Sequence, residues 1–389
     1  MKKNMTRNIL INALGIQDSG GITVLEKMLQ ESILAEKYIY YVFVYVHPNI
    51  INLLNKFVGY ENINFIKVQN KGIVHRLYYE NFYFRSFVKE KKIALIYNFS
   101  GSNQFMIKIP TLVKVQNLMF YSKKLDEAYK RANNNQLWLK QIWSKRLIFL
   151  SMLKQSKNLE IQSTHVKDAL SDFMRVSDKT FFLKNDFFAT EDSFSKPKKY
   201  DFEKKLTFLY IVGPHFDIPH KNMQDFIKAM GTLKELGKDF EIKVTLSFDE
   251  LNSSHLWDKS LNDNTTFLGY LKDKNEIQKL FQNNTVLIST SVIETIGLHI
   301  VEGIQNGILC VAPDEQYSKS VYGDDLLKYK LFDAQSLLGM ILSLDTLEKK
   351  EIQKRIEKTQ KYIIDNEADK FHSIVDIFDE ILEGRKYAK

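Results

Sequence analysis

Glycine and proline are scarce in this sequence of 389 residues, with 16 and 6 positions, and only one cysteine is present. The shortage of glycine and proline excludes collagen-like and low-complexity architectures. The single cysteine, Cys310, cannot form an internal disulfide, so we expect a fold that does not depend on an oxidising compartment and a cytoplasmic protein. No run approaches the roughly 20 apolar residues of a membrane-spanning helix.

Apolar and aromatic residues are plentiful, at 44% and 13% of the sequence, which predicts a folded protein with a large core. The 55 basic and 47 acidic residues give a net charge of +8. This excess favours phosphate groups, nucleic acid or an anionic membrane as partners, and it does not choose among them.

Short β-rich runs alternate with amphipathic segments from the start, a pattern typical of parallel strands joined by crossover helices. We predict a loop from Gly15 to Gly21 and a helix from Ile22 to Glu36. The strands predicted in the first half are Asn8 to Leu14, Tyr38 to His47, Ile63 to Gln69, Ile93 to Phe99, Leu112 to Gln116, Asn158 to Ser163 and Thr180 to Asn185. Together they indicate one doubly wound α/β domain.

A polar, charged stretch from Thr190 to Lys205, which contains Pro197, interrupts this rhythm and suits an exposed connection. We therefore predict one domain over residues 1–195, a linker over 196–205 and a second α/β domain over 206–365. Residues 366–389 are predicted to form a further helix, which could pack on the first domain. The tail from Leu347 to Lys389 is predicted as one long helix or two shorter ones.

The second half repeats the alternation of strands and helices. Its predicted strands are Leu206 to Val212, Phe240 to Phe248, Thr265 to Leu271, Thr285 to Thr290 and Ile308 to Ala312, and its predicted helices are Lys221 to Leu236, Asp273 to Gln282 and Gly297 to Asn306. Two such domains place a cleft at the carboxyl ends of both sheets, so function is expected in the loops from strand to helix.

The segment Thr285 to Pro313 is the most informative, because it joins a buried strand, a polar loop, a short helix and another buried strand. The helix should begin near Gly297 and end at Asn306-Gly307. Its start is predicted to bind an anion, since unsatisfied N–H groups and the positive end of the helix dipole converge there. Glu294 precedes this start and Glu302 follows within the helix. The plain alternative is that Glu294 only complements the helix dipole.

These residues resemble the retaining glycosyltransferases of the GT-B fold, in particular the family-4 group. The matching positions are Ser291, Glu294, Gly297, Leu298, Glu302 and Gly307. The resemblance implies two Rossmann-like domains that face a central cleft, the first on the acceptor side and the second binding a nucleotide sugar. It also implies that Glu294 contacts the donor sugar and Glu302 the ribose. Independently of the resemblance, the position of Thr295 just before the predicted helix start suggests that its hydroxyl adds to the anion site.

The resemblance extends to other loops. It places Lys221 on the donor diphosphate after the turn at Gly213, Tyr270 beside the nucleotide base, and the pair Gly20-Gly21 near the donor phosphates. The family usually has an Arg soon after the position of Gly213. This sequence has Pro214-His215 there, so His215 or His220 is expected to assist Lys221.

The implied reaction is the transfer of a sugar from a UDP- or GDP-sugar to a glycan or a lipid-linked glycan, with Glu294 and Lys221 as the catalytic pair. A cation and a helix N-terminus stabilise the leaving diphosphate without a metal. No Asp-x-Asp lies in a cleft loop, and Asp324-Asp325 is interpreted as a helix start. We expect no cofactor besides the nucleotide sugar and a role in bacterial surface polysaccharide synthesis.

Two segments mix aromatic and basic residues, His75 to Lys92 and Gln136 to Lys157. They are interpreted either as core-packed helices with a solvated basic face or as a surface for an anionic membrane. The second interpretation makes the protein peripheral to the inner membrane. Alternative functions on the same fold are a sugar-nucleotide epimerase and a non-catalytic binding subunit. No Walker loop, zinc cluster or nucleic-acid motif is present, so no nucleic-acid partner is expected.

Overall fold

The structure is a computed structural model that describes residues 7–16, 19–33, 37–105, 107–186, 191–213, 215–271, 273–367 and 370–384. The chain divides into two compact units. The first unit comprises Met1–Tyr121, Lys140–Phe188 and Asp369–Lys389, and the second comprises Ser122–Leu139 and Ala189–Ala368. The predicted helix end at Glu36, the predicted start of the connection at Thr190, and Pro214 lie outside the described residues.

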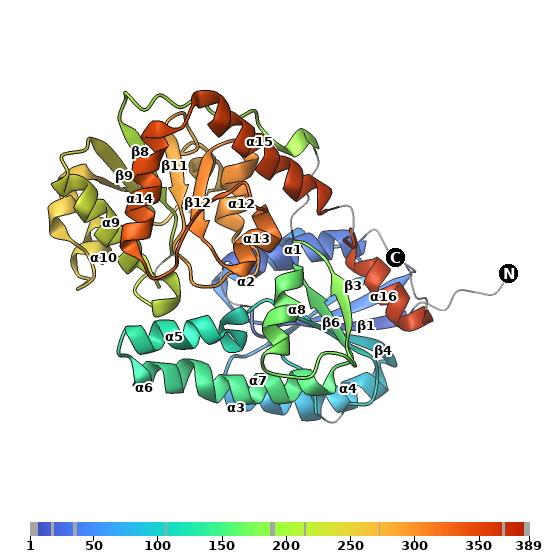
Figure 1. Ribbon diagram of the computed structural model, residues 1–389. Helices are drawn as coiled ribbons and strands as arrows, with labels where there is room; N and C mark the ends of the chain where they lie inside the picture. The colour runs from blue at the N-terminus through green and yellow to red at the C-terminus, as the bar shows by residue number, and fades with distance from the viewer. Residues whose placement is uncertain are drawn as a thin grey trace. The chain divides into compact units, whose positions relative to one another are not determined.

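The first unit contains a parallel sheet of seven strands in the order β3-β2-β1-β4-β5-β6-β7 (Figure 1). The strands are β1 (Arg7–Asn12), β2 (Tyr38–Tyr45), β3 (Ile63–Val68), β4 (Ile93–Asn98), β5 (Thr111–Lys114), β6 (Asn158–Ile161) and β7 (Thr180–Leu183). All seven predicted strands of this half are confirmed. Their β-branched and aromatic runs, such as Tyr38–Tyr45, suit strands that are covered on both faces.

The helices of this unit cover both faces of its sheet. They are α1 (Ser19–Ile33), α2 (Pro48–Lys56), α3 (Ile73–Tyr78), α4 (Phe84–Glu90), α7 (Ser144–Gln155), α8 (Thr164–Ser171) and α16 (Ile374–Glu383), with π-helical turns η1 (Tyr79–Tyr83) and η3 (Leu139–Trp143) and the 3₁₀ turn η2 (Leu118–Tyr121). Apolar residues of α1, α2 and α16 share one core with alternate residues of β1, β2 and β4, and α4 packs on the opposite face.

Helix α16, from the end of the chain, belongs to this first unit. It contacts α1 and β4, and in Figure 1 it lies in dark red beside the blue elements. The Phe378 ring meets the Tyr97 ring edge to face at 5.5 Å. The tail therefore forms two helices, α15 (Lys349–Asp365) and α16, rather than one long helix.

The second unit contains a parallel sheet of six strands in the order β10-β9-β8-β11-β12-β13. The strands are β8 (Leu206–Tyr210), β9 (Phe240–Val244), β10 (Thr265–Phe267), β11 (Thr285–Ile288), β12 (Leu309–Pro313) and β13 (Leu327–Tyr329). The sequence predicted the first five and missed β13, which has only three residues. The prediction that Asp324-Asp325 starts a helix is wrong, because these residues lead into β13.

The other segments of the second unit are α5 (Lys123–Arg131), α6 (Asn135–Trp138), α9 (Met223–Glu235), α10 (Phe248–Asn252), α11 (Lys274–Gln278), α12 (Leu298–Gln305), α13 (Gln316–Tyr322), α14 (Ala334–Ser343) and α15, with 3₁₀ turns η4 (Glu191–Ser193), η5 (Pro219–Lys221), η6 (Lys259–Asn264) and η7 (Leu344–Thr346). Helices α9 and α14 pack on one face of the sheet. Helix α12 packs on the other, where a Cβ at Gly303 would lie 2.8 Å from Leu287. No helix of the described residues is long and apolar enough to cross a membrane.

The segment between the predicted domains is anchored to the second unit. Half of the side chains of residues 196–205 are exposed, but Tyr200 is buried. The Tyr200 hydroxyl donates to the Thr285 carbonyl at 2.6 Å and accepts from the Leu309 N–H at 2.6 Å. The Ser195 N–H donates to the Gln305 carbonyl at 2.7 Å. These bonds hold the segment to the second unit.

Candidate functional site

The candidate site lies where the strand order of the second sheet reverses. From β8 the chain moves to β9 and β10 on one side, and from β11 it moves to β12 and β13 on the other. Open parallel sheets bind ligands at the carboxyl ends of the two strands beside such a reversal. The predicted residues that follow β8 and β11 are Gly213, His215, His220, Lys221, Ser291, Glu294 and Thr295.

Lys221 and Glu294 form an ion pair across these two loops. The Lys221 Nζ lies 3.0 Å from the Glu294 Oε1 and 3.5 Å from the Ser291 Oγ. The side chains are 26% and 19% exposed, so the pair is sheltered but can be reached. Lys221 ends the turn η5, and Asn222, in the left-handed conformation with φ 45°, separates it from α9. The predicted helix start at Lys221 therefore falls two residues early.

Backbone and hydroxyl groups join the two loops beneath this pair. The Thr290 Oγ1 donates to the Lys221 carbonyl at 2.7 Å, and the Tyr210 hydroxyl lies 2.6 Å from the Thr290 Oγ1. The Val292 N–H donates to the His220 carbonyl at 2.8 Å. These bonds fix the loop after β8 against the loop after β11, so they set the distance between Lys221 and Glu294.

The environment of Glu294 favours its ionised form. Burial opposes the charge, but Lys221, His299 and a hydrogen bond from Ser291 outweigh it and lower the pKa of Glu294 from 4.5 to about 2. The carboxylate is therefore charged at neutral pH. It accepts hydrogen bonds, and it offers no proton to a substrate.

Helix α12 starts directly after this carboxylate. Gly297 is its N-cap with φ 64°, and the helix runs from Leu298 to Gln305, as the sequence predicted. A Cβ at Gly297 would lie 2.3 Å from the Tyr322 hydroxyl. That hydroxyl donates to the Ile296 carbonyl, so the glycine is required both by its dihedral angle and by a close neighbour.

Two histidines flank the ion pair. Burial, with the charge of Lys221, lowers the pKa of His220 from 6.5 to about 4. Burial likewise lowers the pKa of His299 to about 4, with Lys221 adding to the effect and Glu294 opposing it. Both rings are neutral at pH 7. His299 lies in the first turn of α12 and was not among the predicted residues, although its position next to Leu298 in the motif was a usable signal.

Residues 193–363, which include all the side chains described in this site, match the family model described as glycosyl transferases group 1. Most of the second unit is thus similar to group 1 glycosyltransferases, and we refer to this unit below as the glycosyltransferase domain. No curated protein matches the chain.

Solved structures resemble the whole chain. Sucrose-phosphate synthase from Thermosynechococcus elongatus is 14% identical, with a TM-score of 0.66 over 97% of this chain and 100% of that one. WaaG, a glycosyltransferase involved in lipopolysaccharide biosynthesis, is 12% identical, with a TM-score of 0.65 over 97% and 100%. TarM from S. aureus is 11% identical, with a TM-score of 0.63 over 97% and 99%. These similarities show that the chain has the GT-B fold.

The remaining predicted residues of the glycosyltransferase domain lie outside the Lys221 and Glu294 pair, and they differ in burial. His215 is exposed, and Leu298 is partly exposed at the start of α12. Glu302 lies in the second half of α12 and is half-buried. Tyr270 is 55% exposed and follows the edge strand β10. The structure thus gathers Lys221, Ser291 and Glu294 by direct contact, and it places Tyr270 two strands away from β8.

Gly20 and Gly21 belong to the first unit and not to the glycosyltransferase domain. Helix α1 begins at Ser19, so both glycines lie in its first turn rather than in the predicted loop. The prediction that the loop extends to Gly21 is therefore wrong, because the helix already includes Gly20 and Gly21.

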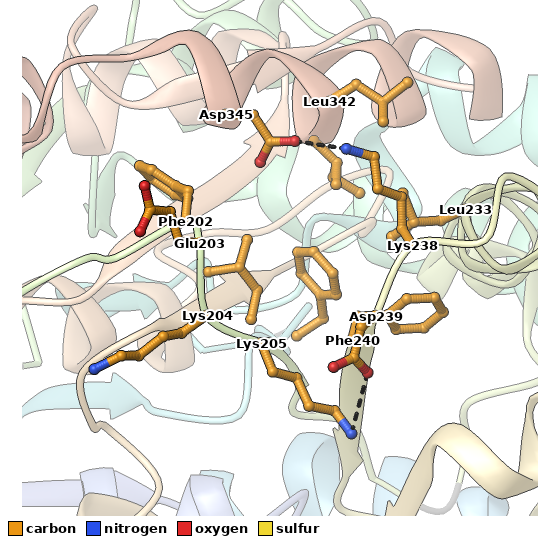
Figure 2. A pocket seen from close by; sticks show the side chains of 13 residues that line it. Phe202, Glu203, Lys204, Lys205, Leu233, Lys238, Asp239, Phe240, Leu342 and Asp345 are labelled. Atoms are coloured by element: carbon orange, nitrogen blue, oxygen red, sulfur yellow. Dashed lines mark hydrogen bonds and ion pairs between the residues drawn. The ribbon is translucent and has the colours of Figure 1, made fainter.

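Figure 2 shows a pocket of about 210 Å³ elsewhere in the glycosyltransferase domain. It lies at the amino ends of β8 and β9, with Phe208 and Phe240 in its wall. Its three lysines are paired, Lys238 with Asp345 at 2.8 Å, Lys205 with Asp239 at 3.5 Å and Lys204 with Asp201 at 3.6 Å. The pocket thus lies at the amino ends of the strands, whereas Lys221 lies beyond their carboxyl ends. Among the described residues, no three His, Cys, Asp or Glu side chains gather as metal ligands.

Proposed function

We propose that the protein is a retaining, metal-independent glycosyltransferase that moves a sugar from a UDP- or GDP-sugar to a glycan or lipid-linked glycan. The observation that carries the proposal is the 3.0 Å pair of Lys221 and Glu294 immediately before the N-terminus of α12. The group 1 family match supports the sugar-transfer part of the proposal, and we propose in addition a role in bacterial surface polysaccharide synthesis. The proposed location is the cytoplasmic side of the inner membrane.

The proposed chemistry follows from the charges of this site. An ammonium group has three N–H donors. Glu294 and Ser291 accept two of those of Lys221, so among the described residues one is left for a diphosphate oxygen. The N–H groups at the start of α12 supply further donors. As the glycosidic bond breaks, the leaving diphosphate gains negative charge, and Lys221 and the helix start stabilise it.

Glu294 has a different role in this proposal. Because its pKa is about 2, its carboxylate accepts hydrogen bonds from donor-sugar hydroxyls rather than acting as a general acid. Retention and metal independence are inferred from the resemblance of the Glu294 to Glu302 segment to retaining enzymes. Under the same proposal, the donor-binding residues besides this pair are Gly20, Gly21, Gly213, His215, His220, Tyr270, Ser291, Thr295, Gly297, Leu298 and Glu302.

Structural relatives support the substrate classes. The TarM structure is a complex with UDP and alpha-GlcNAc-glycerol, and WaaG is involved in lipopolysaccharide biosynthesis. We extend from these two proteins only the general scheme of a nucleotide donor and a surface-glycan acceptor.

The test is a panel of UDP- and GDP-sugars, with release of the free nucleotide diphosphate as the readout. We expect one donor to be consumed and Lys221→Met to lower the rate about 100-fold or more, as loss of a transition-state donor does. Lys243→Met is the matched control, because Lys243 is a 24% exposed lysine of the same unit that lies 3.8 Å from Glu241. Equal effects of the two substitutions, or no nucleotide binding by calorimetry, would contradict the proposal.

A further inference from the structure

Exposed apolar side chains are concentrated on two helical segments of the first unit. One segment runs from α3 through η1 to α4 and exposes Val74, Tyr78 and Phe82, the two rings being 57% and 55% exposed. The other runs from η3 into α7 and exposes Trp143 and Leu147. More than half of the exposed large apolar side chains of the described residues lie on or between these two segments.

One loop joins the two segments. The Phe105 N–H donates to the Asn81 Oδ1 of η1 at 2.8 Å, and the Asn103 Nδ2 donates to the Met152 carbonyl of α7 at 3.3 Å. Phe105 is itself 42% exposed. We call the set Val74, Tyr78, Phe82, Phe105, Trp143 and Leu147 the aromatic face.

The exposed rings are not needed for the core of the unit. Tyr78 and Phe82 stack on each other with centroids 5.7 Å apart, while Phe84 on the same segment is fully buried. In the other segment Ile142 is fully buried and its neighbour Trp143 is 43% exposed. Each segment therefore has one apolar side in the core and a second apolar side in contact with solvent. A core-packed helix with a solvated polar face needs only the first of these.

Basic residues outnumber acidic ones around the aromatic face, and the one exposed acid of the first segment, Glu90, is paired with Lys91 at 2.9 Å. Residues 136–157 contain five basic residues and no acidic residue. Of these basic residues, Lys140, Lys145, Lys154 and Lys157 are exposed. In the first segment Glu80 is buried and bound by Arg76 at 2.9 Å, so its charge is compensated.

We propose that the aromatic face docks on an anionic lipid bilayer. Tyr and Trp side chains favour the boundary between headgroups and acyl chains, and lysines beside them attract anionic headgroups. The inference deepens the proposed function by naming the surface through which the enzyme meets a membrane with a lipid-linked acceptor. The biological purpose of docking rests on the proposed function. The docking itself is tested without sugar transfer.

The test is co-sedimentation of the full chain with vesicles of equal parts phosphatidylglycerol and phosphatidylcholine, compared with vesicles of phosphatidylcholine alone. We expect binding to the anionic vesicles that weakens with added salt. The double variant Tyr78→Ser/Phe82→Ser should bind at least about tenfold more weakly. The double variant Lys140→Gln/Lys145→Gln should lose affinity by about fivefold for each lysine.

Phe248→Ser is the matched control for the apolar changes, because Phe248 is 52% exposed and lies on α10 of the second unit. It should bind vesicles as the unchanged protein does, and thermal melts should show that all variants fold. Failure of the unchanged protein to bind anionic vesicles overturns the proposal, and so does equal loss in the Phe248 variant. A concentration-dependent dimer that the Tyr78→Ser/Phe82→Ser variant abolishes, without vesicle binding, assigns the face to a second copy instead. Nucleotide binding by calorimetry stays unaffected in each case, which separates this test from that of the proposed function.

Discussion

Replacing Gly297 by alanine tests whether the start of α12 is fixed by packing. Two costs arise in the folded protein. The φ of 64° is unfavourable by about 1–2 kcal/mol for a residue with a Cβ. The added Cβ would also lie 2.3 Å from the Tyr322 hydroxyl, so that hydroxyl must move and give up its bond to the Ile296 carbonyl. Leaving a buried polar group unpaired costs about 1–3 kcal/mol.

The sum for Gly297→Ala is therefore about 2–5 kcal/mol of lost unfolding free energy. The second cost should disappear in the background of Tyr322→Phe, because the same Cβ lies 3.6 Å from the Tyr322 Cζ, an ordinary contact distance. In that background we expect Gly297→Ala to cost only the dihedral strain, about 1–2 kcal/mol. The two substitutions are thus expected to be coupled.

Urea unfolding of the four proteins in this cycle measures the coupling. Gly339→Ala is the control, since Gly339 lies within α14, has no positive φ and would place its Cβ with no atom within 4 Å. That change should stabilise the protein by about 0.5–1 kcal/mol. The reasoning is refuted if Gly297→Ala costs the same with and without the Tyr322 hydroxyl.

Two further predictions concern buried charge. His220 and His299 have folded-state pKa values near 4, below their ordinary 6.5, so the unfolded chain takes up protons first as the pH falls. Stability should therefore be complete above pH 6.5 and decline toward pH 4, with a shallower decline in His299→Gln, as urea midpoints at several pH values will show. The Lys114 side chain is 2% exposed and lies 2.7 Å from Asp186. The substitution Lys114→Met should lower the unfolding free energy by about 3–5 kcal/mol, because it leaves buried carboxylates unpaired. Lys358 forms an exposed pair with Asp325, so Lys358→Met should lower the unfolding free energy by less than about 1 kcal/mol. A similar loss in both variants, measured by chemical unfolding, would contradict this account.

The strands were predictable because each is a short apolar run between polar segments. Tyr38–Tyr45 and Thr285–Ile288 have this form, and both are buried. Strand β13 was not predictable on the same basis, since Leu327–Tyr329 has three residues and its central lysine interrupts the apolar pattern. The end of the first loop was missed because glycines indicate a turn, whereas Gly20 and Gly21 occupy the first turn of a helix.

The anchoring of the interdomain segment was also outside the reach of composition. The stretch after Thr190 is polar and charged, which indicates an exposed connection. A single buried side chain departs from that expectation, because the Tyr200 hydroxyl bridges the first carbonyl of β11 and the first N–H of β12. Gly307, which the motif identified as a helix end, also supports this contact, since a Cβ there would lie 2.4 Å from the Lys196 carbonyl.

Within the candidate site, the motif located Glu294 and Gly297 but not the groups that hold them. Tyr322 and Tyr317 lie more than 20 positions later in the sequence, yet their hydroxyls bond to the carbonyls of Ile296 and Ser291. A glycine at position 297 is thus demanded by the packing of Tyr322 even without a ligand. The presence of that glycine alone therefore does not identify a phosphate site. The stronger argument for function is the Lys221 and Glu294 pair, because packing does not require a lysine to be held at the carboxyl ends of two central strands, where it remains within reach of a substrate.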